Sequence, residues 1–157
     1  NLVYNKGGMV ISLLDGFLGR ARFMKATQAY LAEFGTKNAS TEDFQSVLTR
    51  SSGVNLKPFF DAWVRQNALP QIAWDVKTKK EGKGFRTTVT LRQVNGHFPM
   101  TAALDLLGEK AEDKLRLMAR FDKTEVTIEG HTSFKPQRTN FDPLRLVPWV
   151  PAEPASK

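Results

Sequence analysis

Cysteine is absent from this chain of 157 residues, and histidine occurs only as His97 and His131. The absence of cysteine excludes disulfide bonds, thiolate metal sites and a cysteine nucleophile. The scarcity of histidine weighs against a catalytic zinc site, because the His-Glu-x-x-His type needs two histidines four residues apart on one helix. Neither His97 nor His131 has such a partner. We therefore expect no metal ligand in this chain and interpret both histidines as surface residues.

Long apolar runs are also absent. No segment approaches the roughly 18 apolar residues that cross a bilayer, so we expect no membrane span. The longest apolar stretch, residues 7–14, is too short and wrongly flanked for the core of a signal peptide. Hydrophobic residues make up 41% and charged residues 25% of the chain, which is the balance of a soluble globular protein. The compartment, cytoplasmic or periplasmic or secreted, is open at this stage.

Acidic residues are too few to balance the basic ones, and the formal net charge is +7. Such a charge raises the question of nucleic acid or acidic membranes. The excess is divided between both halves of the chain, and its one dense patch consists of Lys77, Lys79, Lys80, Lys83 and Arg86. Only one aromatic residue, Phe85, stands among these cations, which is too few to stack on successive bases. We interpret the patch as a solvated hairpin tip and expect no nucleic acid partner; weak, salt-sensitive polyanion binding is the alternative.

Apolar residues between positions 8 and 69 recur with the period of amphipathic helices. The expected helices cover residues 9–18, 23–34, 40–52 and 56–64. Gly35 is expected to end the second helix in the left-handed conformation that glycine tolerates. Ser40 is expected to cap the third helix, and Pro58 to lie in the first turn of the fourth. The first part of the chain is therefore predicted to be a bundle of short helices.

From Pro70 onward the apolar period changes to two, which is typical of strands with one buried and one wet face. The alternating runs are residues 72–76, 85–91, 100–106, 115–121 and 126–128. About five to seven short strands at this spacing predict an antiparallel β-sandwich. The expected fold class is α+β, with a helical bundle over residues 1–69, a sandwich over 70–149 and a disordered tail over 150–157.

The segment Tyr4-Asn5-Lys6-Gly7, followed by a hydrophobic helix, resembles the Tyr-x-Lys-Gly signature of the M1 aminopeptidase family, zinc peptidases of the gluzincin type. Further similar stretches follow in order at 18–31, 38–43 and 52–66, although Ala68 stands where the family's closing Gly-x-Pro has glycine. The second half is similar in layout to the family's next domain, with the marks Leu91-x-Gln93 and Phe141-Asp142-Pro143. The resemblance identifies the chain as the C-terminal part of such an aminopeptidase. It implies the end of a thermolysin-like catalytic domain, followed by an immunoglobulin-like sandwich.

The resemblance also implies roles for individual residues. In the family, the counterpart of Tyr4 donates its phenolic O–H to the oxyanion that forms on the scissile carbonyl, which gives Tyr4 a catalytic role. Zinc is then the cofactor and a peptide the substrate of the full-length parent, whereas the metal ligands lie upstream of Tyr4. We therefore expect no cofactor and no activity in this chain alone. Lys6 is interpreted as a surface or interdomain charge and Gly7 as a close-packing position.

An alternative from another class is a non-catalytic scaffold or interaction module, derived from the same family after loss of the upstream metal motif. The presence of Tyr4 favours the enzyme, because a scaffold has no need of a phenol at that position. In either case, helices that are normally completed by upstream residues leave apolar surface exposed. We therefore expect self-association through the helical part.

Overall fold

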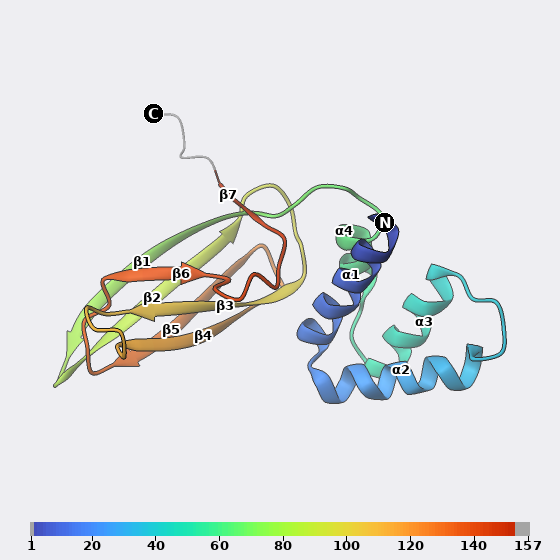
Figure 1. Cartoon of the computed structure of the whole chain (residues 1–157), viewed down its shortest axis with the longest axis horizontal. Coiled ribbons are helices and arrows are strands. Elements are labelled where there is room, and N and C mark those ends of the chain that lie inside the picture. Colours follow the sequence, from blue (N-terminus) through green and yellow to red (C-terminus); the bar gives the residue numbers. More distant parts are fainter. Residues whose placement is uncertain (1, 153–157) are drawn as a thin grey trace. The chain divides into compact units, whose positions relative to one another are not determined.

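The computed structural model describes the backbone of residues 2–152 and the side chains of residues 6–152 (Figure 1). The chain forms two compact units, Asn1–Ala68 and Leu69–Lys157, and each is described by itself. The first contains four helices and the second contains two sheets that are mostly antiparallel. The predicted α+β class is therefore confirmed. The assignment of the two units to a catalytic domain and an immunoglobulin-like domain stays a prediction.

The helical unit consists of α1 (Leu2–Leu18), α2 (Arg20–Phe34), α3 (Thr41–Ser52) and α4 (Lys57–Trp63). Its fully buried side chains are apolar and come from every helix: Leu14, Ala26, Leu48, Phe59 and Phe60. Aromatic rings connect the helices, since Phe44 of α3 lies edge-on to both Tyr30 of α2 and Phe60 of α4. The apolar stripes predicted from the sequence thus converge on one core.

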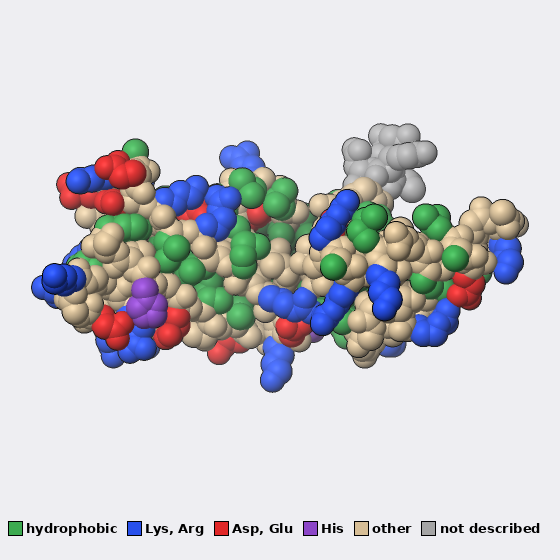
Figure 2. All heavy atoms as spheres, turned by 90° about the horizontal axis from the view of Figure 1, so that it is seen from below, with side chains coloured by type: hydrophobic (Ala, Val, Ile, Leu, Met, Phe, Trp, Pro, Cys, Tyr) green, Lys and Arg blue, Asp and Glu red, His purple; other side chains and the backbone are tan. Residues whose placement is uncertain are grey.

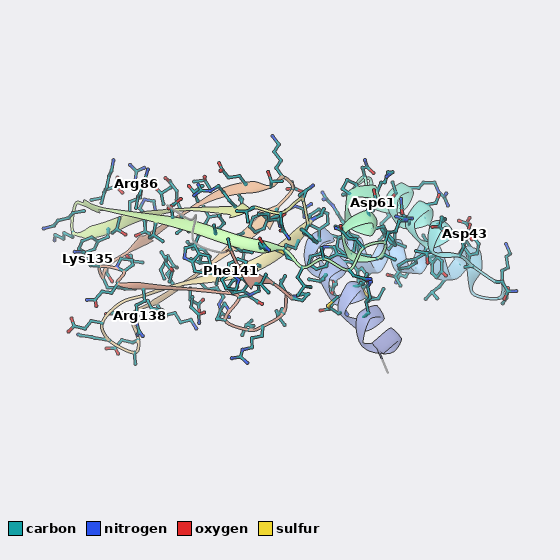
Figure 3. All side chains as sticks on the ribbon, turned by 90° about the horizontal axis from the view of Figure 1, so that it is seen from above. Asp43, Asp61, Arg86, Lys135, Arg138 and Phe141 are labelled. Atoms are coloured by element: carbon teal, nitrogen blue, oxygen red, sulfur yellow. The ribbon has the colours of Figure 1, made fainter. Side chains whose placement is uncertain are left out.

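The two ends of α3 are capped by residues that the sequence predicts for a helix start and a helix stop. Ser40 accepts a hydrogen bond from the Asp43 backbone N–H at 3.1 Å, and the Asp43 carboxylate accepts one from the Ser40 N–H at 2.9 Å. This reciprocal capping box satisfies two N–H groups that the helix start leaves unpaired. The Ser40 hydroxyl also donates to the Asp43 carboxylate, at 2.7 Å, and the bond from the Ser40 N–H together with this one holds the pKa of Asp43 below its usual value. Figure 3 labels Asp43 at this helix start. At the other end Gly53 adopts φ 70°, the left-handed conformation of a helix stop.

The prediction for Gly35 was wrong. Its backbone stays in the right-handed region, with φ −58° and ψ −20°. The glycine is needed there for a different reason: a Cβ at this position would lie 2.5 Å from the carbonyl oxygen of Leu31. The chain then tightens, because the Lys37 N–H bonds back to the Phe34 carbonyl at 3.0 Å.

The second unit begins with β1 (Gln71–Glu81), β2 (Gly84–Gln93) and β3 (Met100–Leu107). It continues with β4 (Lys114–Phe121), β5 (Glu125–Thr132), β6 (Arg138–Phe141) and β7 (Val150–Pro151). The strand orders are β5-β2-β1-β7 in one sheet and β4-β3-β6 in the other, and within residues 2–152 only the pair β1–β7 is parallel. The inward side chains form the core: Ile72, Val89, Leu91, Leu104, Leu106 and Phe121. The alternation read from the sequence corresponds to this buried face except at Val76 of β1, which is 41% exposed.

The predicted disordered tail over residues 150–157 begins too early. Val150 and Pro151 pair with Gln71 and Ile72 as β7, and the Ala152 N–H bonds to the Ile72 carbonyl at 2.9 Å. Trp149 provides the reason, because its ring lies 4.9 Å from Phe141, edge-on, and also contacts Trp74. This aromatic contact brings the following residues to the edge of β1. Residues 153–157 lie outside the described residues.

The basic patch predicted around Gly82 and Gly84 is the tip of the β1–β2 hairpin, where Glu81 pairs with Gly84. Arg86 of this hairpin, Lys135 and Arg138 lie toward the same end of the sandwich (Figure 3). Glu81 lies 3.8 Å from Arg86 and 3.2 Å from His131. On the face shown in Figure 2, Lys and Arg are scattered among acidic and apolar side chains. The arrangement is that of a solvated surface with both signs of charge.

Candidate functional site

Tyr4, the predicted catalytic residue, lies in the first turn of α1. Its side chain is outside the described residues, so the site is built from the backbone of α1 and from the side chains that follow. No acidic residue stands in the first turn of α1 to interact with the helix dipole. Two adjacent glycines, Gly7 and Gly8, follow within the helix, and each lowers helix stability by about 0.5–1 kcal/mol relative to alanine. The start of α1 therefore depends on contacts outside the helix.

Lys6 supplies such a contact. Its ammonium donates to the carbonyl oxygens of Val64 and Gln66, each at 3.4 Å, and to Oδ1 of Asn67 at 3.3 Å. Lysine has three N–H donors, and this arrangement offers one acceptor to each. Val64 is the C-cap of α4, so the charge lies at the negative end of that helix. Lys6, interpreted as a surface or interdomain charge, is half-buried and connects two parts of the helical unit.

The structure does not show the close packing that was expected at Gly7. A Cβ at either position would meet no atom within 4 Å. Gly7 instead borders an open groove of about 460 Å³ between α1, α3 and α4. The groove is mainly apolar, and its lining includes Val10, Ile11, Phe44 and Phe60. Within the described chain, these glycines leave the surface beside the Tyr4 helix low and accessible.

Titratable groups that could bind metal are not assembled here. Among residues 2–152, no group of three or more His, Cys, Asp or Glu side chains could hold a metal ion. His97 has Nε2 3.4 Å from the Phe121 carbonyl, and the exposed His131 lies beside Glu81. A buried charge cluster lies in the sandwich, where Asp105 receives two hydrogen bonds from Arg116, at 2.7 and 2.9 Å, and contacts Lys114. These cations lower the pKa of the Asp105 carboxyl and make the cluster a structural one.

Gln93 and Asp142, which belong to the two short sequence similarities noted in the second half of the chain, have structural roles. The Gln93 side chain donates to the Phe98 carbonyl at 2.8 Å and accepts from the Phe98 N–H at 2.7 Å. The Asp142 carboxylate accepts the N–H groups of Leu146 and Val147, both at 3.0 Å. Both residues thus close loops at the end of the sandwich core.

Comparisons with known proteins give a consistent set of similarities. Residues 1–63 match the Peptidase family M1 domain. Aminopeptidase M1-B of Oryza sativa subsp. japonica is 38% identical over 72 residues, which are 46% of this chain and 8% of that protein. Aminopeptidase N of Haemophilus influenzae is 35% identical over 115 residues, or 65% of this chain and 13% of that protein. Glutamyl aminopeptidase of Homo sapiens is 34% identical over 67 residues, which are 43% of this chain and 7% of that protein.

A similar fold occurs in the crystal structure of Legionella pneumophila aminopeptidase A in complex with aspartic acid. The TM-score is 0.70 at 18% identity, over 97% of this chain and 18% of that one. At this identity the likeness concerns the fold alone. The chain spans between 7% and 13% of the length of the three curated relatives described above.

Proposed function

We propose that the chain belongs, through residues 1–63, to the M1 peptidase family, and that the protein containing it is a zinc-dependent aminopeptidase that removes N-terminal residues from peptides. The observation that carries the proposal is the family match over the helical unit, which includes Tyr4, Lys6 and Gly7 in their signature order. Relatives named as aminopeptidases, 34–38% identical over 67 to 115 residues, support it.

We assign Tyr4 the role of transition-state stabiliser. As a nucleophile adds to the scissile carbonyl, negative charge develops on the carbonyl oxygen. A neutral phenol O–H aimed at that oxygen interacts more strongly with the transition state than with the substrate, and only such a difference accelerates the reaction. The position at the start of α1, followed by two glycines that present no side chain, allows substrate backbone to approach.

Zinc belongs to the parent protein in this proposal. The described residues do not fit a zinc site, since they hold no cluster of three possible ligands. Bound elsewhere in the parent, the metal would act as a Lewis acid and supply an activated water. The isolated chain is therefore proposed to bind no zinc tightly and to cleave no aminoacyl substrate. Metal analysis after dialysis tests this, and one equivalent of zinc that is lost on mutating His97 or His131 would contradict it.

The alternative is a scaffold that keeps the family's fold without its chemistry. The deciding experiment uses the full-length parent: its zinc content and its release of N-terminal residues from peptides, before and after chelation. If the parent is an aminopeptidase, its activity should fall when the metal is removed and return when zinc is added. A His-Glu-x-x-His motif should then be encoded upstream of Tyr4. A folded parent that lacks both the motif and the activity would establish the scaffold.

We also infer that the helical unit self-associates when it is separated from the rest of the parent. The apolar groove is open, and Ile11, Met24 and Leu31 of α1 and α2 are 40%, 40% and 59% exposed. A second copy can cover such surface by apolar contact. Among the described residues no helix is long and apolar enough to cross a membrane. Sedimentation of the isolated chain over a range of concentrations measures the association, and a monomer at every concentration would contradict it.

A further inference from the structure

The Lys6 ammonium is held by one short stretch of chain. Its three acceptors, the carbonyl oxygens of Val64 and Gln66 and Oδ1 of Asn67, lie within four consecutive residues at the end of α4. The last carbonyls of a helix have no partner within that helix, and cations are stabilised beside them. Lys6 therefore satisfies groups that would otherwise need water, and it does so at a fixed place in the unit.

The element to which Lys6 binds is itself anchored in the core. Phe59, Phe60 and Trp63 of α4 are 0%, 1% and 3% exposed. Phe59 stacks against Phe17 near the other end of α1, with ring centroids 5.9 Å apart. Helix α1 thus contacts α4 through Phe17 near its end, and Lys6 near its start binds the segment that follows α4.

The attachment near the start of α1 is the one that matters for Tyr4. Gly7 and Gly8 weaken the helix directly after Lys6, and a Cβ at either position would touch nothing. Positions 4 and 6 lie about 200° apart around a helix axis, so Lys6 affects position 4 through the backbone rather than through direct contact. Without Lys6, the first turns of α1 would fray more readily.

We propose that Lys6 is the positioning residue for Tyr4: its ammonium fixes the first turn of α1 on the end of α4 and thereby sets where the Tyr4 backbone stands. This inference rests on the proposed role of Tyr4 in the parent enzyme. A misplacement of about 1 Å can reduce turnover about a hundredfold, so a loosened first turn is enough to affect the rate. The lysine in the signature then has a role distinct from substrate binding.

The test is a double-mutant cycle in the full-length parent with Lys6→Met and Tyr4→Phe. Lys6→Met keeps most of the apolar stem and removes the donors. We expect it to lower kcat by about tenfold to a hundredfold while KM and zinc content stay unchanged. In the Tyr4→Phe background the same substitution should have little further effect on kcat, because the hydroxyl that it displaces is already absent. Lys6→Arg, which retains charge and several donors, should restore part of the rate.

Two variants guard the interpretation. Lys37→Met removes an exposed lysine from the turn after α2 and should leave kcat unchanged. Asn67→Ala removes one acceptor from an exposed position and should lower kcat in the same direction by a smaller factor, which keeps the test available if Lys6→Met does not fold. Hydrogen exchange of the first amides of α1 should become faster in both Lys6→Met and Asn67→Ala.

The failures of the two proposals are distinguishable. Near-normal turnover of Tyr4→Phe overturns the role of Tyr4 and the positioning inference with it. A slow Tyr4→Phe enzyme together with a normal Lys6→Met enzyme overturns only the inference. Losses of kcat that multiply in the double mutant also overturn it, because the two residues would then act independently.

Discussion

The sandwich buries polar networks, whereas its other ion pairs, such as Arg120–Asp122, lie at the surface like those of the helical unit. In the sandwich, Gln93 bonds the Phe98 backbone inside the core, and Asp105, with 3% of its side chain exposed, holds Arg116 and Lys114. In the helical unit, the charged pairs lie at the surface, as for Asp61, which bonds Lys57 and Arg65 while 43% exposed (Figure 3). Exposed pairs contribute little to stability, whereas a buried network that is fully satisfied fixes its surroundings.

The difference extends to the apolar surface. The groove between α1, α3 and α4 is open, and the exposed Ile11 forms part of its lining. The sandwich also exposes apolar side chains, notably Leu144 and Leu146 at 53% and 60%. These two residues, however, lie in a loop in which Asp142 accepts hydrogen bonds from the backbone N–H groups of Leu146 and Val147. The sandwich is thus stabilised by its own polar and apolar contacts, and the helical unit relies on apolar packing that is open at one side.

The largest expected effect comes from matched truncations of two leucines that are both 0% exposed, Leu48 of α3 and Leu104 of β3. Each Leu→Ala change should cost about 2–5 kcal/mol. In the isolated chain we expect Leu48→Ala to remove most of the slow hydrogen exchange in the helical unit. Leu104→Ala should lower the unfolding midpoint of the sandwich and leave its strands protected. Equal loss of protection in the two variants would break the comparison.

A smaller effect is expected for the two ion-paired aspartates. Asp105→Ala should destabilise the sandwich by about 1–3 kcal/mol, below the usual cost of breaking a buried pair because both cations reach solvent. Asp61→Ala is the exposed control and should leave the unfolding midpoint unchanged within error. Urea unfolding, monitored in each unit by hydrogen exchange, measures the stability change of both variants. A larger cost for Asp61→Ala would contradict the distinction between buried and exposed pairs.

The same carboxylate predicts a dependence on pH. Arg116, and then Lys114, holds the folded-state pKa of Asp105 below its ordinary value of 3.8. The unfolded chain therefore binds a proton first, so the contribution of Asp105 is fully present above about pH 4 and is lost as the pH falls through the folded pKa. Asp105→Asn should remove this acid-dependent part of sandwich stability, which a series of urea midpoints between pH 5 and pH 2 would detect.

The smallest effect concerns the glycines of α1. In the isolated chain Gly7→Ala should stabilise the helix by about 0.5–1 kcal/mol, because the added methyl meets open space. Gly16→Ala is the matched control in the same helix and should do the same. In the parent enzyme, Gly7→Ala should lower activity and Gly16→Ala should not, if substrate approaches beside Tyr4. Similar activity for both variants would remove that reason for the glycine.

Much of the fold follows from local chemistry. Periods of 3.6 and 2 separated the helices from the strands, and Ser40 and Pro58 lie where their side chains suit a helix start. The errors arise where tertiary contacts decide. Gly35 is required by a close carbonyl rather than by a left-handed φ, and the segment after Trp149 pairs as β7 because that ring binds the aromatic cluster.

The site was predictable only in part. Tyr4 was proposed only through a resemblance, because no property of a lone tyrosine in the sequence indicates catalysis. The partners of Lys6 could not be predicted from the sequence, since two of its three acceptors are backbone carbonyls, which every residue has. Asp105 occupies an outward position in the alternation of β3, yet Arg116 on the neighbouring strand covers it. Long side chains on adjacent strands bury a position that the period marks as wet.

The central claim concerns Tyr4 in the full-length parent, and the kcat of Tyr4→Phe tests it most directly. The substitution removes one hydroxyl and keeps the ring. If the hydroxyl stabilises the oxyanion, kcat should fall about a hundred- to a thousandfold, equivalent to about 3–4 kcal/mol, while zinc content, fold and substrate affinity stay as in the wild type. Near-normal turnover with intact zinc would contradict the account, and so would loss of zinc or of the fold, since Tyr4 would then be a structural residue.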